Sequence, residues 1–315
     1  MALEYKPITK LSDLPEENLF TSGHRLCAGC GPAIVARLTV LATQEKPIVV
    51  NATGCLEVGS TLYPYSSWKV PWVHITFENA AAVASGIVEA LDKLASEGKT
   101  KKAPVIAIGG DGGTFDIGIQ ALSGALERGH KFLYICYDNE AYQNTGIQRS
   151  GATPFGAATT TSPAGKVIPG KQERKKDLIG IVLGHHIPYA ATATIAYYRD
   201  YINKVRKALS FNGPTFIHVL APCQLGWRYD PSKTVEISRL AVETRFFPIY
   251  EVENGALKIN FRVPKPKPVE EYLKMQGRFA HLFRPENSHL IKEIQKNVDE
   301  NWARLERIEK AGQIF

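Results

Sequence analysis

A glycine-rich turn with an aspartate at its centre, GGDGG at residues 109–113, is the stretch of this 315-residue chain that most clearly indicates chemistry. Glycines let backbone N–H groups approach the oxygens of a pyrophosphate. Asp111 would repel that ligand unless a divalent cation bridges the carboxylate and the phosphate. Asn139, which follows 28 positions later, and the carbonyl of Ala141 can add two oxygen ligands. We therefore expect a Mg²⁺-bridged diphosphate site formed by Gly110, Asp111, Gly112, Gly113, Asn139 and Ala141.

A dinucleotide site is the first alternative for this turn. It would require the pattern G-x-G-x-x-G and an acidic residue about 20 positions later, and neither is clear here. The arrangement GDG followed by Asn139 is instead the signature of thiamine pyrophosphate sites. A chance glycine-rich turn remains as the second alternative.

Cysteine is the second residue type that can do chemistry. The chain has 5 cysteines, and an odd number favours metal ligation in a reducing compartment over a disulfide framework. Cys136 lies in the apolar run FLYICY and is expected to be buried. The other four lie in loop-like segments, and their thiolates can hold either structural Zn²⁺ or a 4Fe-4S cluster. These four are Cys27 and Cys30 in CAGC, Cys55 in TGC and Cys223 in APC.

The elements that must position these residues alternate between strand and helix, which predicts an α/β fold with a mostly parallel sheet and helices on both faces. Cys55, Asp111, Asn139 and Cys223 each follow a predicted strand, and parallel sheets bind ligands at the carboxyl ends of their strands. Strands are expected at 46–51, 73–77, 104–109, 131–137 and 215–220, helices at 31–41, 78–97, 117–128 and 197–209, and a further apolar element at 178–183.

Three regions are expected along the chain. Residues 1–20 form a proline-punctuated arm, residues 21–232 form the catalytic domain, and residues 233–315 form a small C-terminal extension that contacts other subunits. Within the extension, the strands 250–253 and 257–261 flank Asn254-Gly255, a typical hairpin turn, and a charged helix follows a proline-rich linker.

The net charge of +7 comes with basic clusters such as residues 166–176, which we interpret as solvated loops. No nucleic-acid-binding motif accompanies them, so nucleic acid is not an expected partner. No apolar run approaches the roughly 20 residues that span a bilayer, and no membrane contact is expected. The N-terminal segment lacks the layout of a secretory signal, which favours a cytoplasmic location.

Residues 138–154, DNEAYQNTGIQRSGATP, together with GDGGTFDIG upstream, closely resemble the β subunits of pyruvate:ferredoxin oxidoreductases and related 2-oxoacid:ferredoxin oxidoreductases. The resemblance extends from about Cys27 to Trp227, and is weaker at residues 270–282. It implies a thiamine pyrophosphate-binding fold, with Asn144 facing the thiazolium and the substrate. It also implies that Cys27, Cys30, Cys55 and Cys223 hold a 4Fe-4S cluster beside the thiamine.

The activity that the resemblance implies is oxidative decarboxylation of a small 2-oxoacid, such as conversion of pyruvate and CoA to acetyl-CoA and CO₂. The electrons would pass through the cluster and through further clusters to ferredoxin. Those clusters need more cysteines than this chain has, so they belong to partner subunits (α, γ and a ferredoxin-like δ, or a fusion of these). In the family, a partner also supplies the glutamate that activates the thiamine, so neither Glu57 nor Glu78 is assigned this role.

Gln143 departs from the family pattern, which has an apolar residue between Tyr142 and Asn144. A polar side chain beside the reaction site would suit a more polar substrate, so oxalate oxidation without CoA is an alternative to pyruvate oxidation. An outward-pointing Gln143 is the structural alternative. A non-redox thiamine enzyme with structural zinc is the remaining alternative for the whole chain.

Overall fold

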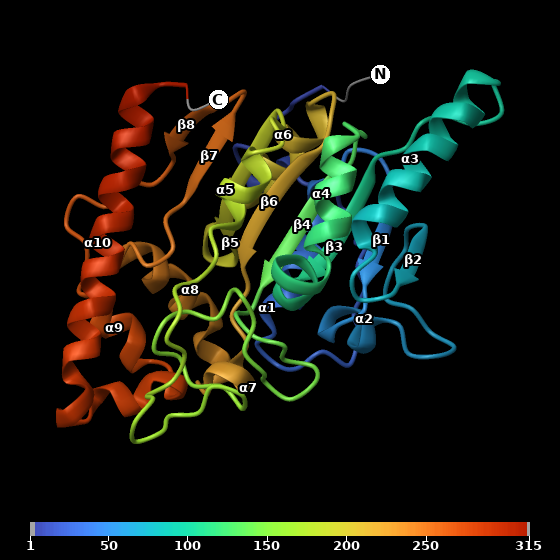
Figure 1. Cartoon of the computed structure of the whole chain (residues 1–315). Coiled ribbons are helices and arrows are strands. Elements are labelled where there is room, and N and C mark those ends of the chain that lie inside the picture. The colour runs from blue at the N-terminus through green and yellow to red at the C-terminus, as the bar shows by residue number, and fades with distance from the viewer. Residues whose placement is uncertain (1–3, 314–315) are drawn as a thin grey trace.

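The centre of the protein is an eight-stranded sheet in the order β2-β1-β3-β4-β6-β5-β7-β8, seen in a computed structural model that describes residues 4–313 (Figure 1). The first six strands along the chain pair in parallel, and β7 and β8 add an antiparallel edge. The bounds are β1 Ile48–Ala52, β2 Trp72–Ile75, β3 Val105–Gly110, β4 Leu133–Asp138, β5 Tyr189–Thr194, β6 Thr215–Leu220, β7 Tyr250–Glu253 and β8 Ala256–Ile259.

Helices cover both faces of the sheet, as the alternation of elements predicts. On one face lie α3 (Ala80–Ser96), α4 (Ile119–Glu127) and α5 (Leu178–Leu183). On the other face lie α1 (Gly31–Ala42) and α6 (Tyr198–Ser210). The central strands β3, β4 and β6 are buried along their whole length, which explains why their sequences are continuously apolar rather than alternating. The expected α/β fold is confirmed.

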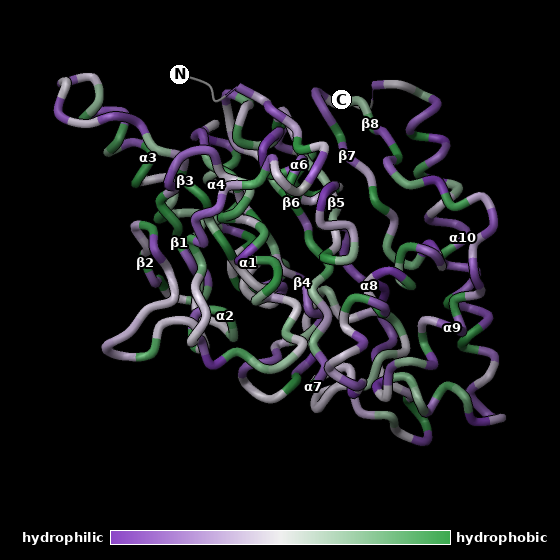
Figure 2. Tube along the Cα trace, turned by 180° about the vertical axis from the view of Figure 1, so that it is seen from behind, coloured by the Kyte–Doolittle hydropathy of each residue, from purple (hydrophilic) through white to green (hydrophobic). Residues whose placement is uncertain are grey.

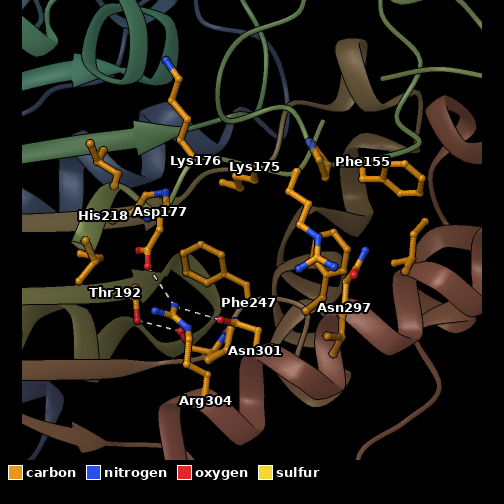
Figure 3. A pocket seen from close by; sticks show the side chains of 18 of the residues that line it. Phe155, Lys175, Lys176, Asp177, Thr192, His218, Phe247, Asn297, Asn301 and Arg304 are labelled. Atoms are coloured by element: carbon orange, nitrogen blue, oxygen red, sulfur yellow. Dashed lines mark hydrogen bonds and ion pairs between the residues drawn. The ribbon is translucent and has the colours of Figure 1, made fainter. Parts of the chain in front are cut away.

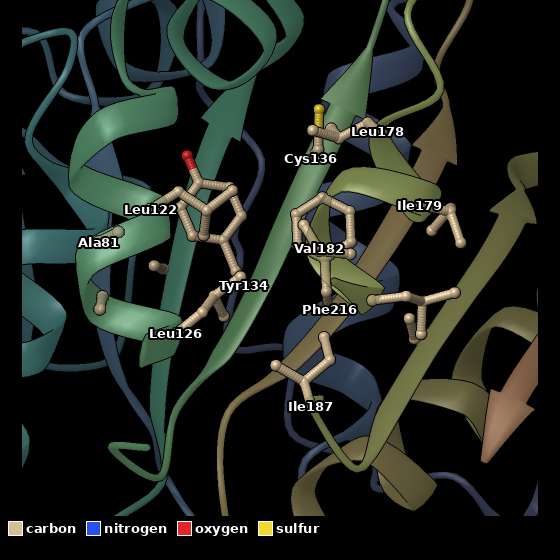
Figure 4. Close-up of a cluster of buried hydrophobic side chains, with 14 of the residues drawn as sticks. Ala81, Leu122, Leu126, Tyr134, Cys136, Leu178, Ile179, Val182, Ile187 and Phe216 are labelled. Carbon is tan, nitrogen blue, oxygen red and sulfur yellow. The ribbon is translucent and has the colours of Figure 1, made fainter. Parts of the chain in front are cut away.

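The core on the α3–α5 face shows how this packing works. Leu122 and Leu126 of α4 and Val182 of α5 lie over Tyr134 of β4 and Phe216 of β6 (Figure 4). Cys136 lies in the same cluster and is fully buried, as expected from its apolar run.

Beyond the parallel strands, the C-terminal residues form a third core and extend the sheet. The helices α8 (Thr234–Glu243), α9 (Val269–Lys274) and α10 (Ser288–Ala311) pack around Trp227 and Leu220. Along α10, hydrophilic and hydrophobic residues alternate, as expected for a helix with one packed face (Figure 2). The predicted hairpin is confirmed, with positive φ at Asn254 (48°) and Gly255 (82°). The domain limits at 20 and 232 stay a prediction.

The N-terminal arm lies on the α1 and α6 side of the sheet from residue 4 onward. Ile8 is buried there and its N–H donates to Asn203 of α6 at 2.7 Å. Arg206 of the same helix donates to the carbonyl of Lys6 at 2.8 Å. The first three residues of the predicted arm lie outside the described residues. None of the helices within residues 4–313 combines the length and the hydropathy of a membrane span.

Two local predictions are wrong. Strand β5 was not expected, because its sequence YAATAT consists mainly of small residues with weak strand preference, and its position between β6 and β7 decides its conformation. Cys55 was expected in a loop, but it is the first residue of the short helix α2 (Cys55–Ser60), which follows Gly54 and buries Leu56.

Candidate functional site

Three predicted ligand groups converge where β3 and β4 end side by side in the sheet. Asp111 directly follows β3, and Asn139 directly follows β4. One polar atom of the Asn139 amide lies 2.8 Å from Asp111 Oδ1 and 2.9 Å from the carbonyl oxygen of Ala141. If that atom is nitrogen, it donates to both oxygens. If it is oxygen, three oxygens face one point, an arrangement that suits a divalent cation.

The Asp111 carboxyl group is almost completely buried, with 1% of its surface exposed. Burial, reinforced by the charge of Asp138, raises the pKa of Asp111 well above its ordinary value, although a hydrogen bond from Ser150 opposes the shift. Ser150 Oγ donates to Asp111 Oδ2 at 2.5 Å. A bound cation would remove the penalty of the buried negative charge. Sequence reasoning did not single out Ser150, since a serine in a long loop carries no distinguishing signal.

A cavity of about 150 Å³ opens beside these oxygens. Pockets for whole small-molecule ligands commonly measure about 300–1,000 Å³, so this chain encloses only part of a cofactor site. At Gly112 a Cβ atom would lie 2.5 Å from the Tyr142 ring, so this position requires glycine. The cavity is lined by Thr53, Gly54, Cys55, Phe77, Gly110, Asp111, Gly112, Tyr137, Asn139, Ala141, Tyr142, Gln143, Asn144 and Thr145. Of the predicted glycines, Gly113 is not in contact with the cavity but packs against Phe77.

Asn144 and Gln143 belong to the loop that forms one wall of the cavity. Asn144 is exposed at the cavity, where a ligand can reach its amide. Gln143 also lines the cavity, but its Nε2 donates to the backbone carbonyl of Asn139 at 3.0 Å. Its Oε1 is buried and has no hydrogen-bond partner among the described residues. A Cβ atom on Gly226 would lie only 2.0 Å from this Oε1, so the amide lies against the segment that follows Cys223.

The cysteine segments adjoin one another next to the same cavity. The N–H of Gly31, which follows Cys30, donates to the carbonyl of Pro222 at 3.1 Å. This contact places the CAGC segment against the segment that carries Cys223. Cys55, the first residue of α2, lines the cavity, while Cys27 is exposed.

The thiols affect one another electrostatically. Burial raises the pKa of Cys30 to about 12, and Cys223, Cys55 and Cys27 add to the shift. Burial also raises the pKa of Cys55 to about 12, with contributions from Cys223, Cys27 and Asp111. These thiols therefore favour the protonated form unless a positive centre binds them. Within residues 4–313, no three His, Cys, Asp or Glu side chains are gathered closely enough to hold a single metal ion.

Buried charges support the segment that carries Asn139. Asp138 and Glu140 have fully buried side chains, and Lys175 forms ion pairs with both. His218 contacts Asp138 at 2.7 Å. Burial alone would raise the pKa of Asp138, but Lys175 and His218 outweigh it and lower the pKa to about 2. Arg278 Nη2 donates to Glu140 at 2.5 Å.

The interpretation of residues 166–176 as a solvated loop is therefore wrong for two of its lysines. Lys175 neutralises the buried carboxylates, and Lys171 is 2% exposed, with its Nζ donating to the carbonyl of Thr153 at 2.6 Å. The acidic residues on either side of Asn139 indicate that buried countercharges are needed, but they do not indicate which basic residues supply them.

A second cavity, of about 270 Å³, adjoins these charges (Figure 3). Lys175 and His218 line it, and an ion pair of 3.0 Å between Asp177 and Arg304 lies at its wall. None of the predicted cofactor ligands lines this cavity. The chemistry expected from the sequence is thus associated with the smaller cavity.

Comparison with known proteins places the chain among thiamine enzymes. Residues 52–219 match the family described as "Thiamine pyrophosphate enzyme, C-terminal TPP binding domain". A 2-oxoglutarate:ferredoxin oxidoreductase from Magnetococcus marinus has a similar fold, with a TM-score of 0.53, 20% identity, and coverage of 76% of this chain and 83% of that chain. The matched residues contain Asp111 and Asn139, and the protein is a thiamine pyrophosphate enzyme.

Curated relatives define the subfamily. Pyruvate synthase subunit PorB of Methanocaldococcus jannaschii is 60% identical over 91% of this chain and 96% of its own length. PorB of Thermotoga maritima is 49% identical over 98% of both chains. Ketoisovalerate oxidoreductase subunit VorB of Pyrococcus abyssi is 48% identical over 96% of both chains. The chain belongs to the β subunits of the 2-oxoacid:ferredoxin oxidoreductases, of the pyruvate synthase type.

Proposed function

We propose that this subunit binds Mg²⁺ with its thiamine pyrophosphate, holds a 4Fe-4S cluster, and oxidises pyruvate with CoA to acetyl-CoA and CO₂, passing the electrons to ferredoxin. The observation that carries the proposal is the position of Cys55, which lines the same cavity as Asp111 and Asn139. An electron acceptor held by Cys55 would therefore lie beside the cofactor. A structural zinc site would not require this proximity.

The residues around the cavity have distinct roles in this proposal. Asp111, Asn139 and the carbonyl of Ala141 would hold Mg²⁺, and the glycines would let the diphosphate approach the backbone. Thiamine pyrophosphate, when bound, supplies an electron sink for the carbon that loses CO₂. Asn144 would donate a hydrogen bond to the substrate oxygen that gains negative charge.

Cys27, Cys30, Cys55 and Cys223 would bind the cluster as thiolates. Burial opposes that ionisation, as the raised pKa values of Cys30 and Cys55 indicate. The positive charge of the iron would offset this cost, so cluster binding would release protons and stabilise the fold. The exposure of Cys27 leaves this side accessible to a partner.

Partner subunits would complete the site. Asp111 is the one carboxylate that lines the smaller cavity among the described residues, and in this proposal it binds the cation. This supports a glutamate from a partner as the group that activates the thiamine. A ferredoxin-like δ subunit, or a fused equivalent, would carry the further clusters, beside α and γ subunits. Tyr63 and Tyr65, which are 98% and 79% exposed, offer apolar surface for such contacts. A cytoplasmic location stays a prediction.

Pyruvate is the favoured substrate because the 60% identical relative is named a pyruvate synthase subunit, whereas the relative named for ketoisovalerate is 48% identical. The oxalate alternative relied on a polar group of Gln143 at the reaction site. Its Nε2 donates to the Asn139 carbonyl and its Oε1 lies against Gly226, so neither polar atom of the amide gives a reason to prefer oxalate over pyruvate.

The test uses the complete complex, purified without oxygen. We expect a brown protein whose reduction of ferredoxin depends on pyruvate, CoA and thiamine pyrophosphate. Oxalate, 2-oxoglutarate and a branched 2-oxoacid serve as comparison substrates. A colourless, zinc-loaded complex would contradict the cluster, and faster turnover of another 2-oxoacid would contradict pyruvate.

A further inference from the structure

Trp227 joins the cysteine side of the site to the metal-ligand side. It is the last residue of α7 (Gln224–Trp227), the short helix that begins directly after Cys223, and its N–H donates to the Cys223 carbonyl at 2.9 Å. Its indole Nε1 donates to the backbone carbonyl of Asn139 at 2.8 Å, and the side chain is fully buried. One side chain therefore links the segment of a cluster ligand to the backbone of a cation ligand.

Arg278 contacts both sides at once. Its guanidinium carbon lies over the Trp227 ring, 3.8 Å from the ring centre, in a cation–π contact. Its Nη2 donates to Glu140 at 2.5 Å, and its Nε donates to Gln276 at 2.9 Å. Arg278 is 2% exposed, so these contacts are shielded from water. It lies 138 positions after Glu140, in a part of the chain that contributes none of the proposed cofactor ligands.

Glu140 is the residue through which Arg278 can act on the cation ligands. It stands between Asn139 and Ala141, and its φ of 63° is uncommon for a residue other than glycine. Its backbone conformation therefore sets the directions of the Asn139 side chain and the Ala141 carbonyl relative to each other. Ion pairs from Arg278 and Lys175 hold its carboxylate.

We propose that Trp227 and Arg278 are positioning residues that couple the two cofactor sites, by holding the Asn139–Ala141 segment against the segment that carries Cys223. The inference rests on the proposed function, because it presumes Mg²⁺ at the first segment and an iron–sulfur cluster at the second. Groups that orient metal ligands typically change metal affinity by about 10-fold to 100-fold when they are replaced. Neither residue contacts the reacting atoms.

Two variants test the coupling in the assembled complex. Trp227→Phe keeps an aromatic ring for Arg278 but removes the indole N–H, and Arg278→Lys keeps the charge but removes the planar stack. The chain contains a matched control pair, since the guanidinium carbon of Arg245 lies 4.1 Å from the centre of the Trp302 ring and the Trp302 Nε1 has no hydrogen-bond partner within residues 4–313. Trp302→Phe and Arg245→Lys therefore make the same chemical changes outside both cofactor sites.

Two readouts are needed, and neither is catalytic activity. Calorimetric titration of cofactor-depleted complex with Mg²⁺ and thiamine pyrophosphate measures the first site, and the electron paramagnetic resonance spectrum of the reduced cluster reports the second. We expect Trp227→Phe and Arg278→Lys to weaken cofactor binding by about 10-fold or more and to alter the cluster spectrum. The control variants should bind within about twofold of the unchanged complex, as expected of replacements outside the metal-ligand shell.

The outcomes separate the inference from the proposed function. If either readout stays unchanged in both test variants, or if the control variants lose as much affinity, the coupling is wrong. If the unchanged complex binds no Mg²⁺ with thiamine pyrophosphate or contains no iron–sulfur cluster, the proposed function is wrong.

Discussion

The candidate site has a cation side, formed by Asp111, Asn139 and Ala141, and a cysteine side, formed by Cys27, Cys30, Cys55 and Cys223. The two sides differ in how far this chain encloses them. Asp111 is 1% exposed, and Asn139 and Ala141 are each 4% exposed. By contrast, Cys27 is exposed, and the three other proposed cluster ligands are only partly buried. The oxygens follow two adjacent strands of the sheet, whereas the thiols come from three separate segments of the chain.

This difference matches what each proposed cofactor needs. Mg²⁺ requires oxygen ligands in a strict geometry, and strand ends fixed by a sheet provide it. An iron–sulfur cluster that delivers electrons to another subunit must lie near the surface, and helix and loop ends provide that position. We infer that the cation side is nearly complete in this chain, while the cysteine side becomes fully covered only in the assembled complex.

Asp111→Asn should break the cation side with the largest effect. The change removes the carboxylate among the three oxygen groups. Replacing a group that only orients a metal ligand weakens binding by up to about 100-fold, so for this direct ligand we expect binding of Mg²⁺ with thiamine pyrophosphate to weaken by more than that. Calorimetry measures the affinity. The cluster spectrum should persist. Loss of the spectrum would show that the structure of the cysteine side depends on the Asp111 carboxylate.

Cys30→Ser should break the cysteine side and spare the cation side. An alkoxide is a poorer iron ligand than a thiolate, so we expect loss of most of the visible cluster absorbance and of ferredoxin reduction. Affinity for Mg²⁺ with thiamine pyrophosphate should stay within about threefold, since no direct cation ligand is changed. Cys136→Ala is the control, because this buried thiol lies in the hydrophobic core and should leave the cluster intact.

Ser150→Ala should have a smaller effect on the cation side. The Ser150 hydroxyl donates to Asp111 Oδ2 at 2.5 Å, and its removal leaves that oxygen without this donor. We expect about tenfold weaker binding of Mg²⁺ with thiamine pyrophosphate. Ser150→Thr retains a hydroxyl and should restore part of the affinity in the same titration. Equal losses in both variants would indicate a packing effect instead.

The pH dependence of cofactor binding tests the Asp111 carboxyl group without replacing a residue. Because burial raises the pKa of Asp111, the folded chain without cofactor holds a proton there that the unfolded chain loses at its ordinary pKa of 3.8. The free energy of unfolding should therefore fall as the pH rises from that value through the raised pKa. Mg²⁺ must displace this proton, so affinity should rise with pH over the same window, by at most about tenfold per pH unit. The control is Asp111→Asn, in which the affinity for Mg²⁺ should not change with pH. An affinity that does not change with pH in the unchanged chain would contradict the prediction.

Local patterns in the sequence were enough to predict the candidate cofactor ligands. Asp111 and Asn139 could be paired in advance because each follows a buried strand, and parallel strands end at one edge. The apolar run around Cys136 likewise identified it as a core residue, and Asn254-Gly255 identified the hairpin. These features depend on neighbours a few residues away or on a fixed sheet geometry.

Only the tertiary structure decided how the ligands are held. Lys175, Trp227 and Arg278 reach the site from segments that lie far from Asp111 and Asn139 in the chain, and Ser150 reaches Asp111 from the loop that follows Asn139. None of these residues belongs to a periodic pattern. The same holds for β5, whose small residues become a strand because β6 and β7 flank it. Such contacts depend on which segments pack together, and packing is a property of the whole chain rather than of any local stretch.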